Sequence, residues 1–315
     1  MNNLTKHTPV MLTESINALA IEKNGIYVDA TFGFGGHSKA ILNKLGKAGK
    51  LYALDKDASV IKIAEQEFIH DKRFTLKHGC FSSLESLSKE WGIHGSVNGI
   101  LFDLGVSSEH LDNPERGFSF MRKGPIDMRF DQSSGISANK WLATASEDLI
   151  SKTIRKYGEE RYAKRIAKRI VLQRGKEKIN TTDDLVQIIN KAIPKNEKNK
   201  HNATRTFQAI RIYINQELEI LRNTLESTYN ILAPKGRLVL ITYHSLEERV
   251  IKDFLTLTDK SLSAPKDLPL SNQFLTKLFK TINKSIKPTS KEIESNIRSR
   301  SAKLNILEKC NEIDS

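Results

Sequence analysis

Apolar residues in the first third of the chain follow two different periods. Short, nearly continuous apolar runs predict strands at 25–30, 49–54, 73–77 and 97–104. Apolar residues at helical spacing follow the first three runs and predict helices at 37–45, 58–68 and 81–91. Strands that are apolar on both sides are typical of a parallel sheet covered by helices on both faces. The pattern therefore predicts an α/β fold with a doubly wound sheet.

The alternation of strands and helices stops after the fourth predicted strand. The next convincing strand, 237–242, begins about 130 residues later, whereas one crossover helix with its loops needs about 25 to 35 residues. The periodic segment 204–231 predicts that crossover helix. About 90 residues are left over, and their periodicity predicts helices at about 146–174 and from 181 onward, before a polar linker at 191–201.

This surplus predicts two domains. They are a discontinuous core of residues 1–110 and 203–315, and an inserted all-helical domain of residues 111–202. After the fifth strand the order of elements is less defined, and we expect a loosely held surface segment within 257–286.

The composition narrows the class of protein. The 315 residues include 50 Lys and Arg against 37 Asp and Glu, a net charge of +13, which attracts polyanions and nucleic acid first. The two cysteines, Cys80 and Cys310, form no CxxC pair, which excludes a disulfide scaffold and a zinc ribbon. No apolar run is long enough for a membrane helix, and the N-terminus lacks the apolar stretch of a secretory signal. We expect a cytoplasmic protein that does not contact a membrane.

A glycine-rich turn at 31–36 joins the first predicted strand to a helix. Glycines there let the backbone approach a ligand beside the free N–H groups of the helix. Gly33 and Gly35 have the G-x-G spacing of dinucleotide-binding proteins, but Ser38 replaces the third glycine of that fingerprint. The strand also ends in Asp29, which repels a pyrophosphate and suits a cation. S-adenosylmethionine therefore fits better than NAD, and a glycine turn without a ligand is the alternative.

Two more acids end predicted strands. Asp55 is placed to accept hydrogen bonds from two ribose hydroxyls, unless it is simply solvated. Asp103 ends the fourth strand at the edge of the sheet where ligands bind in such folds. The exocyclic amine of cytosine or adenine is a poor nucleophile, and an oxygen that accepts its N–H holds it in line with a methyl donor. Asp103 or the backbone carbonyl beside it supplies such an oxygen; alternatively Asp103 caps a turn.

Residues 116–131 mix aromatic, cationic and acidic side chains. Such a mixture suits an extruded, stacked base, and the candidates are Arg116, Phe118, Phe120, Asp127 and Arg129. The alternative is that the two phenylalanines pin the insert to the core.

The segment after the fifth strand offers four candidates at the same edge of the sheet, His244, Ser245, Glu247 and Arg249. A Ser hydrolase is excluded because no Gly-x-Ser-x-Gly elbow is present. The eight histidines are dispersed, so no metal site is expected.

Basic residues concentrate in two places. The helix predicted at 146–174 carries cations that we expect to bind RNA phosphates, namely Arg155, Lys156, Arg161, Lys164, Arg165, Lys168, Arg169 and Arg174. The segment Arg298–Lys303 is a second basic patch, either solvated or in contact with phosphates.

Eight segments in a fixed order carry a resemblance to one family. They are HTPVML (7–12), DATFGFGGHS (29–38), DLGVSS (103–108), RGFSF (116–120), GPIDMR (124–129), ATRTFQAIRI (203–212), YHSLEERVIK (243–252) and RSRSAKL (298–304). From about residue 6 to 309 the chain resembles the bacterial 16S rRNA cytosine-N4 methyltransferases. The resemblance implies a Rossmann-like, class I S-adenosylmethionine-dependent core with a substrate-recognition insert. It also implies methylation of the N4 amine of a cytidine in the decoding region of 16S rRNA in the small ribosomal subunit, without a metal; a homodimer is compatible with it.

The resemblance also implies roles for single residues. It assigns cofactor contacts to Gly35, Gly36 and His37, the ribose to Asp55, the adenine to Phe81, and the reactive methyl to Asp103. His110 stands where the family usually has a glutamine that contacts the cofactor, and Ile297 and Asn305 replace a usual proline and arginine. The alternatives are a non-catalytic ribosome assembly factor with a cofactor-sensing pocket, a methyltransferase of another nucleic-acid base, and, less favoured, a dehydrogenase.

Overall fold

The computed structural model describes residues 9–68, 70–194, 201–259 and 277–311. The chain divides into two compact units, Met1–Gly105 with Leu218–Ser315, and Val106–Glu217. The second unit is wider than the insert expected at 111–202, because helices at both of its ends belong to it. None of the described helices is long and apolar enough to cross a membrane.

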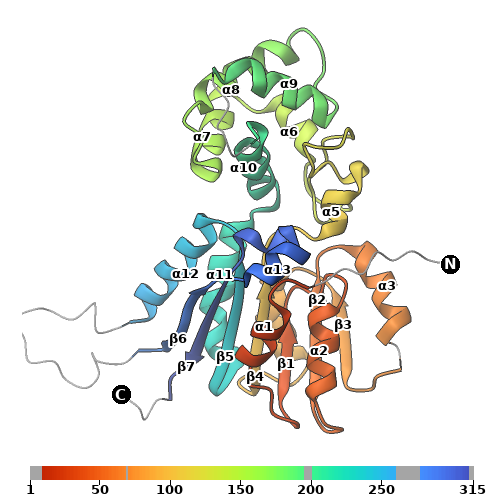
Figure 1. Ribbon diagram of the computed structural model, residues 1–315, viewed down its shortest axis with the longest axis vertical. Helices are drawn as coiled ribbons and strands as arrows, with labels where there is room; N and C mark the ends of the chain where they lie inside the picture. The colour runs from red at the N-terminus through yellow and green to blue at the C-terminus, as the bar shows by residue number, and fades with distance from the viewer. Residues whose placement is uncertain (1–8, 69, 195–200, 260–276, 312–315) are drawn as a thin grey trace, which may run out of the picture. The chain divides into compact units, whose positions relative to one another are not determined.

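The described residues of the first unit form a seven-stranded sheet with the order β3-β2-β1-β4-β5-β7-β6 (Figure 1). The strands are β1 (Ile26–Asp29), β2 (Lys50–Asp55), β3 (Phe74–His78), β4 (Val97–Asp103), β5 (Leu232–Thr242), β6 (Phe279–Ile286) and β7 (Lys303–Lys309). Strands β1 to β5 pair in parallel, and β7 is antiparallel to both β5 and β6. This topology confirms the predicted Rossmann-like, doubly wound fold class.

Helices cover both faces of this sheet. They are α1 (Leu12–Ala18), α2 (Gly36–Lys44) and α3 (Ala58–Phe68) on one face, and α4 (Leu84–Glu90), α11 (Glu217–Ile231) and α12 (Ser245–Thr258) on the other. Successive strand residues point to opposite faces, so Tyr27 packs in one apolar cluster and Val28 in the other. Leu101 and Phe102 are divided in the same way. Both sides of each central strand are buried, which explains their continuous apolar sequences.

The carboxyl ends of the parallel strands share one edge of the sheet. Asp29 pairs in register with Ala53 and Leu101, and Asp103 pairs with Ile241. The strand order reverses direction between β1 and β4, and such a switch point is where ligands bind in doubly wound folds. The edge therefore collects the residues that follow β1, β2, β4 and β5.

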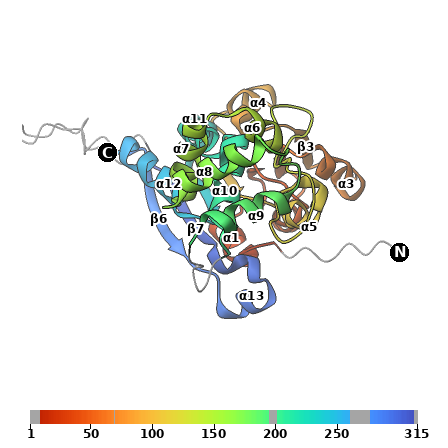
Figure 2. The same cartoon turned by 90° about the horizontal axis from the view of Figure 1, so that it is seen from above.

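The described part of the second unit is helical (Figure 2), and it has its own apolar cluster. Its helices are α5 (Ser108–Asp112), η2 (Pro114–Arg116), α6 (Ala138–Thr144), α7 (Glu147–Gly158), α8 (Ala163–Arg174), α9 (Thr182–Ala192) and α10 (Ala203–Asn215). The prediction of a single helix at 146–174 is wrong. The segment forms two helices, α7 and α8, because Glu159 between them takes a left-handed conformation with φ 50°. A side chain at Gly158 would lie 2.5 Å from the Arg205 carbonyl oxygen, so the end of α7 needs glycine there to approach α10.

The helix predicted at 204–231 is also two helices. Gln216, with φ 54°, separates α10 from α11. Just before this break, the Asn215 side chain donates to the Met128 carbonyl (2.7 Å) and accepts from the Phe130 N–H (2.9 Å). The break therefore ends α10 where its last side chain anchors the 128–130 loop.

The C-terminal segment completes the sheet, which the sequence pattern did not predict. It adds β6 and β7 together with α13 (Ser290–Ser295) and η5 (Ile297–Ser301). The loosely held segment expected within 257–286 falls mostly on 260–276, outside the described residues, and its last part forms β6. Asn305, where the family usually has arginine, is 2% exposed within β7, and its Nδ2 donates to Glu248 (2.6 Å). Arg298 and Arg300 are exposed on η5.

Candidate active site

Asp29 is fully buried at the end of β1. Its carboxylate accepts hydrogen bonds from the Ser38 hydroxyl (2.7 Å) and the Thr31 N–H (3.2 Å). Burial raises the pKa of Asp29 to about 6; the charge of Asp55 adds to this rise and the two hydrogen bonds oppose it. Ser38, which replaces the third glycine of the dinucleotide fingerprint, is thus the partner of this buried acid.

The glycine-rich turn folds back onto the end of β2. Gly33 (φ 54°) and Gly35 (φ 73°) take left-handed conformations, and the Gly33 N–H donates to Asp55 Oδ2 (2.7 Å). A side chain at Gly35 would lie 2.6 Å from the Phe32 ring, and one at Gly36 would lie 2.2 Å from Pro9. Packing alone therefore requires glycine at 35 and 36, and their contact with a cofactor stays a prediction.

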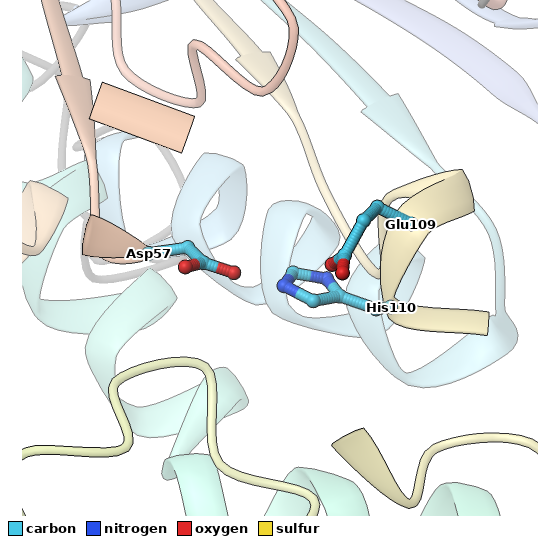
Figure 3. Close-up of side chains that lie close together, drawn as sticks. All are labelled: Asp57, Glu109 and His110. Carbon is cyan, nitrogen blue, oxygen red and sulfur yellow. The ribbon is translucent and has the colours of Figure 1, made fainter. Parts of the chain in front are cut away.

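Asp55 and Phe81 lie near the carboxyl ends of β2 and β3. Asp55 is half-buried, and its Oδ1 accepts the Asp57 N–H (2.8 Å) while Oδ2 accepts from Gly33. Asp57, seen in Figure 3, in turn accepts from the Ser59 N–H (2.9 Å) at the start of α3. Phe81 is half-buried and meets Phe102 edge-on at 5.4 Å between ring centroids. The carboxylate of Asp55 therefore joins the glycine-rich turn to the segment that leads into α3.

Asp103 is held from three sides at the end of β4. The Tyr243 hydroxyl donates to its Oδ1 (2.7 Å), and its own N–H donates to Thr31 Oγ1 (2.6 Å). On the other side, His37 Nδ1 lies 3.8 Å from Asp103 Oδ2, and His37 Nε2 lies 3.2 Å from the Val10 carbonyl. The Asp103 side chain remains 23% exposed, so the carboxylate is fixed in direction yet reachable.

The same neighbours set the ionisation of Asp103. Burial raises its pKa to about 7; the Tyr243 hydrogen bond opposes this rise and the charge of Asp29 adds to it. Burial and the negative charge of Asp103 raise the pKa of Tyr243 well above its usual 10, so the phenol stays protonated and donates. Among the described residues, no lysine or arginine pairs with Asp29 or Asp103. Asp29, Asp55 and Asp103, here called the acidic strand edge, therefore form an anionic site.

The residues after β5 divide between site and scaffold. His244 precedes α12, where its Nδ1 accepts the Glu247 N–H (3.4 Å) while Glu247 accepts the N–H groups of Tyr243 (2.7 Å) and His244 (3.2 Å). This reciprocal capping fixes the start of the helix and with it the direction of Tyr243. Ser245 and Arg249 are exposed on α12. Tyr243 was missed as a candidate, although it directly follows the strand beside Asp103.

In the second unit, His110 and Glu109 project from α5 (Figure 3). His110 Nδ1 accepts the Ser107 N–H (3.2 Å), which caps the helix, and its ring packs against Phe118 at 4.9 Å. Arg116 is only 5% exposed and donates to the carbonyls of Arg129 (3.1 Å) and Phe130 (2.9 Å). These contacts lie within the second unit, and the cofactor role of His110 and the base contact of Arg116 remain predictions.

The other candidates of the insert also have internal partners. Phe118 is buried, whereas the half-buried Phe120 stacks on His201 at 4.8 Å. Arg129 forms a two-pronged ion pair with Asp127 (2.9 and 2.8 Å). Burial raises the pKa of Asp127, but the hydrogen bonds from Arg129 lower it by more, so the pKa of Asp127 lies below its usual value. The structure therefore brings Asp103, His37 and Tyr243 together in the core, and places the aromatic and Arg–Asp candidates in the separate insert.

Known proteins are similar in sequence to this chain over nearly its whole length. A protein of Legionella pneumophila (strain Corby) named ribosomal RNA small subunit methyltransferase H is 49% identical over 306 residues, which cover 97% of this chain and 99% of the relative. A protein of the same name from Alteromonas mediterranea is 48% identical over 309 residues, 98% of each chain. A crystal structure of an rRNA methylase from Streptococcus thermophilus is 14% identical with a TM-score of 0.42, covering 95% of both chains. The pattern of the MraW methylase family matches residues 4–310, and the chain belongs to that family.

Proposed function

We propose that this protein transfers the methyl group of S-adenosylmethionine to the exocyclic N4 amine of a cytidine in the decoding region of 16S rRNA. The observation that carries the proposal is the acidic strand edge at the switch point of the sheet. Membership of a methylase family and relatives named for the small-subunit rRNA support the reaction class and the substrate.

The acidic strand edge fits this cofactor on chemical grounds. Asp29 and Asp103 have raised pKa values, and within the described part of the chain His37, 3.8 Å from Asp103, is the only basic side chain paired with either of them, so a bound cation favours their charged forms. S-adenosylmethionine carries a sulfonium and an ammonium group and no phosphate, and when bound it supplies an activated methyl group. A dinucleotide would instead place a pyrophosphate against these acids. The NAD alternative is disfavoured for this reason as well as by Ser38.

The residues that would hold the cofactor surround the glycine-rich turn. Asp55, at the end of β2, would accept the ribose hydroxyls, and Phe81 would pack against the adenine. Gly35 and Gly36 would let the backbone approach the ligand, and His37 would face it from the first turn of α2. The family resemblance also assigns a cofactor contact to His110, which lies on α5.

Asp103 would act on the acceptor. With Oδ1 occupied by the Tyr243 hydroxyl, Oδ2 is the oxygen left to accept the amine N–H, and it would turn the nitrogen lone pair out of conjugation with the ring. This role needs the carboxylate in its charged form. Asp103 would thus serve as an acceptor and orienting group rather than as a strong base, and its Oδ2 would take the proton that the amine loses as its nitrogen gains the methyl group.

The test uses small subunits from cells that lack this enzyme, the purified protein, and S-adenosylmethionine with a labelled methyl group. We expect label in N4-methylated cytidine after digestion of the rRNA and mass spectrometry of its nucleosides. Asp103→Asn keeps the shape of the side chain and is expected to abolish incorporation. Label in another nucleoside would refute the acceptor, and tight subunit binding without any incorporation would refute transfer in favour of an assembly factor.

A further inference from the structure

One face of α8 carries four exposed cations and no acid. Lys164, Arg165, Lys168 and Arg169, here called the α8 cationic face, recur at i, i+1, i+4 and i+5 and so lie on one side of the helix. The sequence of α8 contains no Asp or Glu, and none of the four cations pairs with a described acidic residue. On α7, by contrast, the exposed Lys152 is paired with Asp148 at 2.7 Å.

The apolar side of α8 is buried inside the insert. Ala163, Ile166, Ala167 and Ile170 have no exposed surface and belong to the apolar cluster of the insert. A membrane-binding helix needs such a side free for lipid, and a protein interface usually has apolar or aromatic residues at its centre. On the side of the α8 cationic face, Leu172 is the exposed apolar residue of α8 (51%), one turn after Lys168, and one leucine is too small an apolar surface for either kind of partner. The chemistry of this face therefore favours a hydrophilic polyanion over a membrane or a folded protein.

The arrangement works against the stability of the helix. Like charges at i and i+4, such as Lys164 with Lys168 and Arg165 with Arg169, repel each other. Arg165 of this face and Arg161, which precedes α8, both lie over the ring of Tyr162, at 5.9 and 4.7 Å from its centroid. Stacking of this kind limits the motion of long side chains and presents their donors outward.

We propose that the α8 cationic face is a docking surface for the phosphate backbone of RNA, separate from the acidic strand edge. This proposal rests on the proposed RNA substrate. Contacts from α8 to phosphates would strengthen binding and position the RNA, but they would not select the base. The structure also narrows the basic run seen in the sequence. Arg174 is excluded from the surface, because its guanidinium donates to the carbonyls of Leu142 (2.7 Å) and Ala145 (2.6 Å) inside the insert.

The test is the double variant Lys164→Glu, Arg165→Glu in the full chain. Each new glutamate stands four residues before a cation and near the N-terminus of α8, so the melting temperature is expected to stay or rise. The matched control, Lys23→Glu with Lys47→Glu, changes the net charge equally at exposed positions before β1 and β2. The probes are small subunits lacking the methyl group and protein-free 16S rRNA, without cofactor.

The measured quantity is the slope of log affinity against log salt concentration. Each lost phosphate contact lowers the slope by about 0.7 to 0.9, so loss of two contacts flattens it by about 1.5, and repulsion lowers the affinity further. The control is expected to keep the wild-type slope. An unchanged slope in the α8 variant, or an equal change in the control, would overturn the proposal. Because binding is measured without cofactor, a failure of methyl transfer leaves this result interpretable. In a turnover assay the variant is expected to raise KM and leave kcat unchanged.

Discussion

The hydroxyl of Tyr243 is expected to set the pH at which the enzyme becomes active. It donates to Asp103 Oδ1 at 2.7 Å and holds the pKa of Asp103, about 7, below the value that burial alone would give. Tyr243→Phe removes this donor and keeps the ring, which packs beside Gly105. The pKa of Asp103 must then rise, and the charged acceptor forms only at higher pH.

The size of the effect follows from the hydrogen bond. A hydrogen bond to a charged group contributes about 1.5 to 3 kcal/mol, and one pH unit corresponds to about 1.36 kcal/mol. The acid limb of the profile of kcat/KM against pH should therefore move up by about one to two units. Starting from a half-ionised Asp103 at pH 7, activity at that pH should fall about 5- to 50-fold and recover in more alkaline buffer. The positive charge of the bound cofactor lowers the pKa of Asp103 in the wild type and in the variant alike, so the difference between their two pH profiles remains.

The assay is methyl incorporation into small subunits from pH 6 to 9.5, with Tyr52→Phe as the matched control. Tyr52 is half-buried and stacks on Trp91 at 4.8 Å, away from Asp103, so its variant should keep the wild-type profile. A uniform loss across all pH values would show that Tyr243 acts only through packing. A limb that moved to lower pH would refute the proposed role of the hydroxyl.

Three further substitutions separate the acids of the site. Asp103→Ala should lower kcat at saturating cofactor by more than about 100-fold, and it should also weaken binding of S-adenosylmethionine, followed by calorimetry, because it removes one carboxylate of the acidic strand edge; unchanged turnover would remove Asp103 from the reaction. Asp55→Ala should weaken cofactor binding by about 10- to 100-fold with little effect on kcat at saturation, and unchanged affinity would refute its contact with the ribose. Asp29→Asn tests stability: the raised pKa of Asp29, about 6, means that the folded state binds the proton more tightly, so wild-type stability falls as pH rises from about 4 to 6. The variant should therefore be more stable than wild type at pH 8, by up to about 3 kcal/mol, and equal melting curves at pH 8 would contradict the burial argument.

The core of the fold was predictable because its strands are buried on both faces. Continuous apolar runs at 25–30 and 97–104 carry that signal directly, and the acids that end them predict the ligand-binding edge. β7 was not predictable in the same way, because buried polar residues interrupt its pattern. Asn305 and Glu308 are 2% and 8% exposed yet polar, and their partners come from distant parts of the chain, including Glu248 and Arg237.

The break at Gln216 had no sequence signal, because Gln216 takes a positive φ without being glycine or asparagine and helical propensity favours continuing through it. The break at Glu159 had one signal, Gly158, which the prediction of a single helix did not use. The sequence also did not reveal the direction of the candidate side chains in the insert. A segment with Arg116 and Phe118 predicts a base-binding loop, but the sequence does not reveal that these side chains point inward and hold the loop together. Tyr243 became a candidate only when the register placed the end of β5 beside Asp103.

The most direct test of the proposed function is to locate the methyl group within the rRNA. Small subunits from cells lacking the enzyme would be treated with the purified protein and labelled cofactor, and the 16S rRNA would be cut into oligonucleotides and sequenced by mass spectrometry. The account predicts a single labelled cytidine, methylated on N4, in the decoding region, and none with Asp103→Asn. A label outside the decoding region, on another atom, or retained in the Asp103→Asn variant would contradict it.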